Sequence, residues 1–427
     1  MSNNNFFQKE KAMLVGVIHG ELNRDKVDQH LDELLLLTET AGGEVIDTVI
    51  QKINRINPSF FIGSGKANEI IDRAKQQNIS MIIFDDELSP SHVKNYNKLS
   101  KEIKIIDRSA LILEIFKQHA QSKEAKTQVE LAQLQYMLPR LTRAWTHLER
   151  QMGGIGTRAG AGETQIEVDR RLVRTRISKL KKELIKIDKE RENQRKRRDA
   201  KFKVALVGYT NAGKSTLMNV LSGANVYTED QLFATLDTTI RSVKLDRTHQ
   251  VLLSDTVGFI RKLPHHLIAS FKSTLNEVIL ADLILLVLDA SSNQTLEQYE
   301  TIKSVLKELG ANRCPKLIVM NKIDQMSSAI KINHLKVKFP DSIFISALNQ
   351  LRIDQLTSNI MQIMDENLEE LNLTFSYNEP KQIAIAQEGV KVMERNYNND
   401  HVELKVKATR KKIGQLLTLI EKKKTSN

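Results

Sequence analysis

The sequence predicts a multidomain α/β protein, and three observations support this. Short apolar runs with the length of strands alternate with stretches of helical periodicity along most of the 427 residues. One apolar run leads into a glycine-rich loop and then into a helical stretch, an order typical of doubly wound α/β domains. The hydrophobic content of 41% is ample for packed cores in two or three domains.

The first predicted domain spans residues 1–108. Strand-like runs near residues 12–17, 81–85 and 103–107 alternate with helical stretches at 27–39 and 67–77. This alternation indicates a small α/β domain with a parallel sheet.

The second predicted unit, residues 109–200, is a long helical hairpin. Its first arm carries apolar residues at helical spacing, namely Leu131, Leu134, Met137, Leu138 and Leu141. A second helical run extends from 163 towards 199, and five glycines occupy the tip at 153–162. Between residues 170 and 203 there are sixteen Lys or Arg and five Asp or Glu, which favours contact with RNA phosphates over a merely solvated face. Arg158 in the tip and nearby residues could pair or stack with nucleotides, namely Arg143, Trp145, His147 and Arg150.

The third predicted domain, residues 201–368, contains a phosphate-binding loop. The spacing G-x-x-x-x-G-K-[ST] is carried by Gly208, Tyr209, Thr210, Asn211, Ala212, Gly213, Lys214 and Ser215, with Thr216 after it. Backbone N–H groups of such a loop, together with the start of the next helix, bind phosphates. Lys214 supplies charge to the β and γ phosphates, and Ser215 offers a hydroxyl to Mg²⁺. After the next apolar run come Asp255, Thr256, Val257 and Gly258, of which Asp255 would hold the metal through water and the Gly258 N–H would contact the γ-phosphate.

The base is indicated by a third motif, Asn321, Lys322, Ile323 and Asp324. The Asp324 carboxylate can accept from guanine N1–H and the exocyclic amine, a donor pair that adenine lacks. Asn321 fits the O6/N7 edge, and Lys322 packs along the ring. Ser346 and Ala347 follow a further strand-like run and can present an N–H to O6. In this order the motifs predict a P-loop GTPase domain of the Ras-like type.

The remaining residues, 369–427, predict a small C-terminal α/β domain with an alternating strand at 401–407 and a helix from about 410. The net charge of +12 lies almost entirely in the basic hairpin segment. The single cysteine excludes an internal disulfide, and the Asn-rich start lacks the regions of a signal peptide. No run has the roughly 18 apolar residues of a membrane span, so we expect a cytoplasmic protein.

These motifs resemble the HflX family of ribosome-associated GTPases, among the Obg/HflX-like translation factors. The resemblance rests on 128–134, 138–141, 153–158, 163–165, 169–171 and the phosphate loop. It implies a monomer that binds the large (50S) subunit and rRNA through the hairpin and glycine tip and splits stalled or idle ribosomes. It also implies relief of ribosome-targeting antibiotics in some relatives, with peripheral membrane association left open. Switch I would be Phe233, Ala234, Thr235, Leu236 and Asp237, with Thr235 on Mg²⁺ and Thr239 as the second candidate.

Two departures from the family pattern stand out. Ala159-Gly160-Ala161-Gly162 replaces a Gly-Pro-Gly step after the tip arginine, and Thr238 stands where relatives commonly carry proline.

The residue after Gly258 is Phe259, which cannot orient a water by hydrogen bonding. We therefore expect slow intrinsic hydrolysis that the ribosome stimulates, with Asn211 as a candidate ligand for K⁺ beside the phosphates. Two alternatives remain open. One is an assembly GTPase acting on immature large subunits. The other is an ATP-driven RNA remodeller using Gly63 to Lys66, where a glycine turn before a helix is the favoured interpretation.

Overall fold

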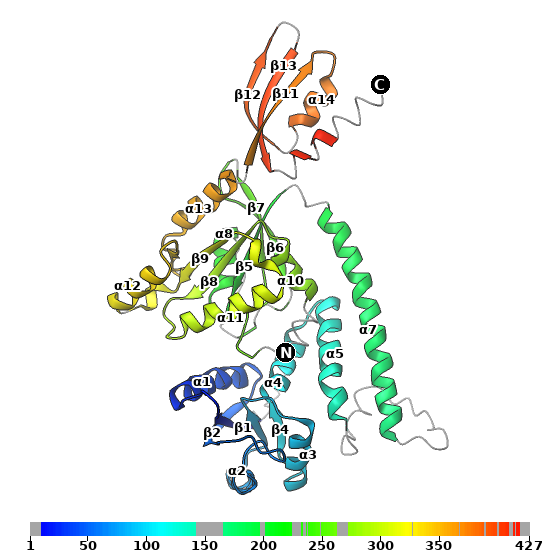
Figure 1. Cartoon of the computed structure of the whole chain (residues 1–427), viewed down its shortest axis with the longest axis vertical. Helices are drawn as coiled ribbons and strands as arrows, with labels where there is room; N and C mark the ends of the chain where they lie inside the picture. The colour runs from blue at the N-terminus through cyan, green and yellow to red at the C-terminus, as the bar shows by residue number, and fades with distance from the viewer. Residues whose placement is uncertain are drawn as a thin grey trace, which may run out of the picture.

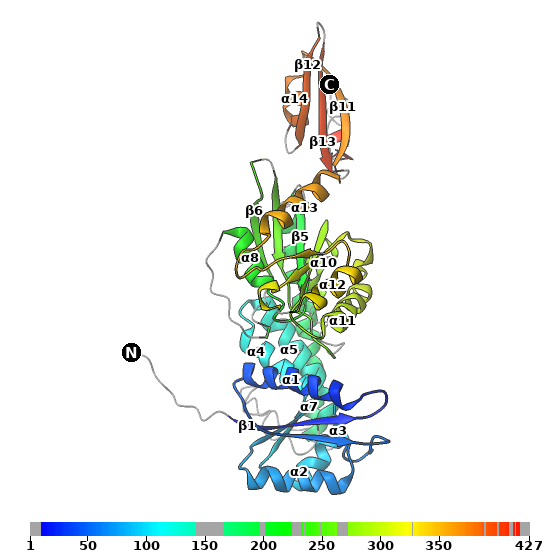
Figure 2. The ribbon, with the colours of Figure 1, turned by 90° about the vertical axis from the view of Figure 1, so that its left-hand side faces the viewer.

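The computed structural model describes residues 10–141, 165–196, 201–223, 232–233, 236, 238–247, 249–262, 272–326, 328–366, 368–387, 390–398, 401–409, 413–414 and 416–418. Three parts follow one another along the long axis, with the N-terminal sheet at one end and the C-terminal sheet at the other (Figures 1 and 2). Within these ranges no helix is both long and apolar enough to cross a bilayer. The predicted tip at 153–162 lies outside them, as do Arg143, Trp145, His147, Arg150 and Arg158.

The N-terminal part is the predicted parallel α/β domain. Its four strands have the order β2-β1-β3-β4, all parallel. Helices α1 and α4 cover one face of the sheet, and α2 and α3 cover the other (Figure 2). The elements are β1 (Lys11–Ile18), α1 (Arg24–Thr40), β2 (Glu44–Lys52), α2 (Ser64–Gln76), β3 (Met81–Phe84), α3 (Pro90–Leu99), β4 (Lys104–Asp107) and α4 (Arg108–His119).

Three features of this domain were not predicted, namely strand β2, helix α3 and the packing of α4 on this sheet. Strand β2 alternates exposed and partly buried residues at the sheet edge, a weaker signal than the buried runs of β1 and β3. Helix α4 packs on α1, β3 and β4, so the expected boundary at 108 separates this helix from its own sheet.

The segment Gly63 to Lys66 does not form a phosphate loop here. Gly63 is the extended N-cap of α2, and Lys66 pairs with Glu69. The preceding strand ends at Lys52, well before the helix begins. The glycines therefore form a turn before a helix.

The helical hairpin consists of α5 (Lys123–Met137), a short 3₁₀ turn η1 (Leu138–Arg140) and α7 (Gln165–Lys196). The predicted first arm is interrupted, because Ser122 caps α5 with its hydroxyl and separates it from α4. The two arms pack through a small apolar core that contains Leu131, Leu134, Leu141, Val173 and Leu180.

The G domain has a six-stranded sheet of order β10-β9-β8-β5-β7-β6, in which only the edge strand β6 is antiparallel. Side chains alternate along β5, so that Val204 and Leu206 face one core and Ala205 and Val207 face the other. Its elements are β5 (Phe202–Gly208), α8 (Lys214–Ser222), β6 (Thr239–Lys244), β7 (Gln250–Asp255), α10 (Lys272–Ile279), β8 (Leu283–Asp289), α11 (Thr295–Glu308), η2 (Ala311–Arg313), β9 (Lys316–Asn321), η3 (Ile323–Gln325), α12 (Ala329–Lys338), β10 (Ile343–Phe344) and α13 (Ile353–Glu366).

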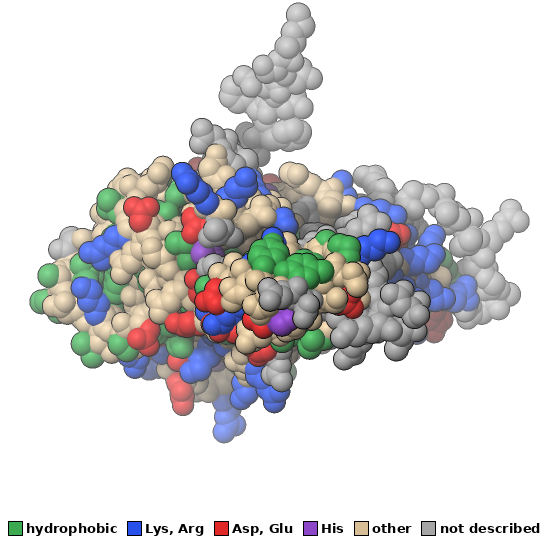
Figure 3. Space-filling model, turned by 90° about the horizontal axis from the view of Figure 1, so that it is seen from above, with side chains coloured by type: hydrophobic (Ala, Val, Ile, Leu, Met, Phe, Trp, Pro, Cys, Tyr) green, Lys and Arg blue, Asp and Glu red, His purple; other side chains and the backbone are tan. Residues whose placement is uncertain are grey.

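The C-terminal part is an antiparallel sheet of order β11-β13-β12 with one face under α14. The alternation predicted at 401–407 is confirmed, since Val402, Leu404 and Val406 are buried. Viewed along the long axis from this end, charged side chains of both signs are interspersed over the described surface (Figure 3). The elements are β11 (Leu368–Ser376), α14 (Pro380–Gln387), β12 (Lys391–Tyr397) and β13 (His401–Thr409).

Candidate GTP site

The predicted nucleotide motifs meet at one edge of the G-domain sheet. Parallel strands β5, β7 and β9 end at Gly208, Asp255 and Asn321, and β10 ends just before Ser346. Since the carboxyl ends of parallel strands share an edge, the four motifs lie together at the position where open α/β sheets bind ligands.

At the two glycine positions of the phosphate-loop motif, neighbouring atoms leave no room for a Cβ. A Cβ on Gly208 would lie 2.3 Å from the Val287 carbonyl oxygen. Gly213 has φ +89°, and its Cβ would lie 2.2 Å from Asn321 Nδ2. The loop therefore fits closely between β8 and the base motif.

Lys214 begins α8 and is buried, and its Nζ donates to the Tyr209 carbonyl oxygen at 2.9 Å. Burial lowers the pKa of Lys214 to about 8, although Asp255 opposes this shift. A buried ammonium has lost its stabilisation by water, so negatively charged phosphates bound beside it stabilise its charge strongly. The position thus suits a lysine that neutralises nucleotide charge.

The residues expected at a metal fit Mg²⁺. Ser215 Oγ donates to Asp255 Oδ2 at 2.7 Å, so a hydroxyl and a buried carboxylate already converge. Mg²⁺ prefers such oxygen donors and keeps waters and phosphates as further ligands. The described residues contain no cluster of three or more His, Cys, Asp or Glu that could hold a metal, so the phosphates would complete this set.

Asn321 has an additional role that the sequence did not reveal. Its Nδ2 donates to the Ala212 carbonyl at 2.9 Å, and its Oδ1 accepts from the Ala347 N–H at 2.9 Å. The side chain is 2% exposed. Asn321 therefore braces the phosphate loop against the Ser346-Ala347 segment.

The remaining base motif is more open. Asp324 lies exposed in η3, and Lys322 has φ +62° with Nζ 3.1 Å from Asp289 Oδ2. Lys322 Nζ also donates to Asn211 Oδ1 at 3.5 Å, and Asn211 itself has φ +59°. The base motif and the phosphate loop are thus linked by both Asn321 and Lys322.

Of the expected switch I residues, the structure describes Phe233 and Leu236, which are buried, while Ala234, Thr235 and Asp237 lie outside the described residues. The Phe233 ring stacks edge-on against Phe116 of α4, with centroids 4.6 Å apart. Thr239, the second metal candidate, is exposed at the start of β6 opposite Asp255.

Switch II, which we define as residues 255–262, lies directly over the phosphate loop. The Thr210 N–H donates to the Phe259 carbonyl at 2.8 Å, and the Phe259 N–H donates to the Gly208 carbonyl at 3.0 Å. A Cβ on Gly258 would lie 2.9 Å from the Thr210 Cα and 3.0 Å from Lys214 Nζ, and the backbone contact leaves room only for glycine. Phe259 is 2% exposed, and its side chain packs inwards.

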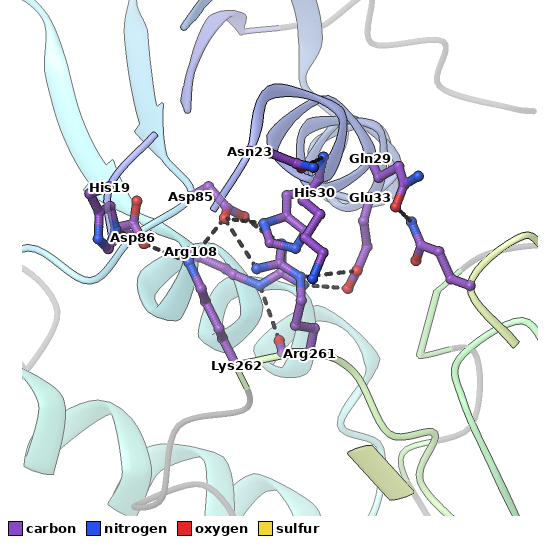
Figure 4. A network of polar contacts seen from close by, with 12 residues as sticks. His19, Asn23, Gln29, His30, Glu33, Asp85, Asp86, Arg108, Arg261 and Lys262 are labelled. Carbon is purple, nitrogen blue, oxygen red and sulfur yellow. Dashed lines mark hydrogen bonds and ion pairs between the residues drawn. The ribbon is translucent and has the colours of Figure 1, made fainter. Parts of the chain in front are cut away.

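The end of switch II enters an ion-pair network with the N-terminal domain (Figure 4). Arg261 donates to Asp85 from Nη1 at 3.2 Å and from Nη2 at 2.9 Å. Lys262 bonds Asp85 at 3.1 Å and Asp86 at 2.5 Å. Arg108 pairs with Glu33 and donates to Asp85 at 3.1 Å. Asp85 and Arg108 directly follow β3 and β4, and switch II follows β7, so the carboxyl edge of the N-terminal sheet faces that of the G-domain sheet.

This network controls the charge of its members. Burial alone would raise the pKa of Asp85, but Arg261, Arg108 and Lys262 hold it well below its usual range. Burial, with Arg261, lowers the pKa of the adjacent His30 to about 4. Asp85 is therefore an anion and His30 neutral at physiological pH.

Sequence reasoning missed these contacts because no local motif carries them. Arg108 and Arg261 are 153 positions apart, and Asp85 and Arg261 are 176 apart. The available signal was limited to the position of Asp85 at the end of a predicted strand.

Comparison with known proteins follows this domain order. Three family models match consecutive parts of the chain: GTP-binding GTPase N-terminal at residues 28–117, GTP-binding GTPase Middle Region at 119–198, and 50S ribosome-binding GTPase at 203–322. The chain is 45% identical over 391 residues to the GTPase HflX of Flavobacterium psychrophilum, covering 86% of this chain and 93% of that protein.

The GTPase HflX of Escherichia coli is 45% identical over 351 residues, covering 81% of each chain. That of Caldanaerobacter subterraneus is 42% identical over 403 residues, covering 94% of this chain and 91% of the relative. Identity of this extent across the N-terminal domain, the hairpin and the G domain shows that this chain belongs to the HflX family of GTPases and hydrolyses GTP.

Proposed function

We propose that this GTPase binds the large ribosomal subunit in the cytoplasm and dissociates stalled or idle ribosomes, with relief of ribosome-targeting antibiotics as one consequence. The description of the matching G-domain model, a 50S ribosome-binding GTPase, supports the partner. The glycine tip and its flanking aromatic and basic residues would contact rRNA in this proposal.

The observation that carries the partner is the basic outer face of α7. Its inner face packs on α5 through Val173 and Leu180. Two of its arginines pair with glutamates of α5, Arg176 with Glu130 and Arg191 with Glu124. Among the residues of α7 whose side chains the structure describes, the exposed cations are Arg170, Arg171, Arg174, Lys179, Lys181, Lys182, Lys186 and Lys189. Several Lys and Arg side chains lie on the side of Figure 3 where Figure 1 shows α7.

A charge-reversal experiment tests this face. Changing Lys179, Lys181 and Lys182 to Glu is expected to weaken binding to large subunits and to flatten its salt dependence. Each lost phosphate contact lowers the slope of log affinity against log salt by about 1. A matched control reverses exposed lysines of the N-terminal domain, Lys75, Lys94 and Lys98. Sedimentation binding that both triple variants retain equally would contradict the proposal.

In the nucleotide site, we assign the phosphates to the loop from Gly208 to Thr216, with Lys214 on the β and γ groups. Ser215 and Thr235 would hold Mg²⁺, with Asp255 behind a water, and the ion would neutralise phosphate charge. Asp324 would read guanine. The convergence of the motifs at one sheet edge supports these assignments, except that of Thr235, which lies outside the described residues and rests on the resemblance to the family.

We also propose that Asn211 binds K⁺ beside the phosphates, where the ion would neutralise phosphate charge. Phe259 can neither supply charge there nor orient a water. The side-chain oxygen Oδ1 of Asn211 already accepts from a cation, the Lys322 ammonium. Turnover that is equal in sodium and potassium buffers would remove this role.

Coupling between nucleotide and partner would run through the switches. GTP would order them around its γ-phosphate and Mg²⁺, and hydrolysis would release that conformation. The free energy for separating subunits would come from tighter binding to the split state than to the joined one, because a ligand shifts an equilibrium only by its preference between states.

A further inference from the structure

We propose that Tyr209 is a positioning residue for GTP hydrolysis, whose hydroxyl holds switch II in place and makes Glu33 of the N-terminal domain part of the GTPase apparatus. The inference rests on the proposed GTP site and on the contact with the γ-phosphate that the sequence predicts for the Gly258 N–H. It concerns GTP hydrolysis by the protein alone, so it can be tested independently of ribosome splitting.

The hydroxyl of Tyr209 joins three segments at one atom. It accepts a hydrogen bond from the Arg261 backbone N–H at 2.6 Å, in switch II. It donates to the Glu33 carboxylate of α1, whose two oxygens each lie 3.2 Å away. Tyr209 itself follows the first glycine of the phosphate loop and is 6% exposed. Burial and the neighbouring Glu33 raise the pKa of this hydroxyl, so it remains a donor at physiological pH.

Glu33 is itself held rigidly. Arg108 pairs with one of its oxygens, and Arg261 Nε lies 3.6 Å from the other. The same Arg108 donates from Nε to the Arg261 carbonyl at 3.2 Å. The backbone of Arg261 is therefore fixed at its N–H by Tyr209 and at its carbonyl by Arg108 (Figure 4 shows the Arg108, Glu33 and Arg261 side chains).

This anchor lies close to the chemistry. Arg261 is three residues after Gly258, and Phe259 between them is paired on both backbone groups with the phosphate loop. Gly258 thus has anchors on its C-terminal side at Phe259 and at Arg261, and its own backbone lies near Lys214 Nζ. An N–H already fixed where phosphate charge develops needs no ordering during the reaction, and such preorganisation lowers the barrier. Removing the Tyr209 hydroxyl loosens switch II and leaves the Arg261 N–H without this acceptor.

The test is steady-state GTP hydrolysis by the full chain without ribosomes. Tyr209→Phe is expected to lower kcat roughly five- to tenfold, the scale of one ordinary lost hydrogen bond, with KM and GDP affinity within about twofold. Glu33→Leu is expected to have a similar effect. The double variant should lose little more than either single one, because the two residues act as a unit.

Tyr96→Phe is the matched control. Tyr96 is also buried and donates its hydroxyl to a backbone carbonyl, that of Phe60 at 3.0 Å, but within the N-terminal domain. Its kcat should equal that of the unmodified chain, while its thermal unfolding shifts about as much as that of Tyr209→Phe. Equal kcat for the two tyrosine variants would overturn the proposal. So would a rise in KM and GDP dissociation with kcat unchanged, since Tyr209 would then serve nucleotide binding alone.

Discussion

Replacing Lys214 by alanine is expected to lower kcat/KM for GTP by about 10²- to 10³-fold, the scale for removal of one preorganised charge-stabilising group. The lysine is buried, and burial depresses its pKa, so its charge is costly in the free protein and is compensated when phosphates bind. Fluorescence titration measures the loss of nucleotide affinity, and phosphate release measures the loss of turnover. Lys214→Met keeps much of the buried volume and should be equally inactive.

A second lysine provides the control for this variant. Lys331 also donates its ammonium to a backbone carbonyl, that of Ser291 at 2.6 Å, in the same domain. Lys331→Ala should retain GTP turnover. Normal ribosome splitting by Lys214→Ala in the presence of GTP would contradict the role assigned to Lys214.

Replacing Asp324 by asparagine is expected to weaken GTP binding by about 10²-fold or more, because the hydrogen bond from the guanine amine is lost and the one from N1–H goes to an uncharged amide oxygen. The amide now presents a donor where guanine also presents its amine. Xanthine carries a carbonyl at that position, so the variant should bind xanthosine triphosphate more tightly than GTP. Competition between the two nucleotides measures this directly.

The control for Asp324→Asn is Asp341→Asn, an exposed carboxylate of the same domain. It should leave guanine preference unchanged. An Asp324→Asn protein that still prefers GTP would show that another group reads the base.

The sequence was sufficient to predict that the nucleotide motifs lie together at one sheet edge, because each motif is contiguous and follows a buried strand. Strands β5, β7 and β9 are nearly continuous apolar runs, which fixes where the loops after them must meet. The brace made by Asn321 was not predictable in this way. Its partners Ala212 and Ala347 bond through backbone atoms, which leave no trace in residue type.

The contact between the N-terminal domain and the switches was also beyond sequence reasoning. In the sequence, nothing distinguishes Arg261 and Lys262 from exposed basic residues, or Asp85 and Glu33 from exposed acidic ones. Only the facing of two sheet edges brings them together, and that depends on long-range packing such as Phe116 on Phe233. The charge count of the hairpin had a similar limit, since it could not separate Arg176 and Arg191, which pair with α5, from the exposed cations.

The central claim is that the large ribosomal subunit is the partner that completes this GTPase. The most direct test measures GTP turnover in potassium buffer with purified mature large subunits, with immature large subunits and with neither. We predict slow turnover by the protein alone and strong stimulation by mature subunits. Stimulation only by immature particles, or none by either, would contradict the splitting function; stimulation only by immature particles would favour an assembly GTPase.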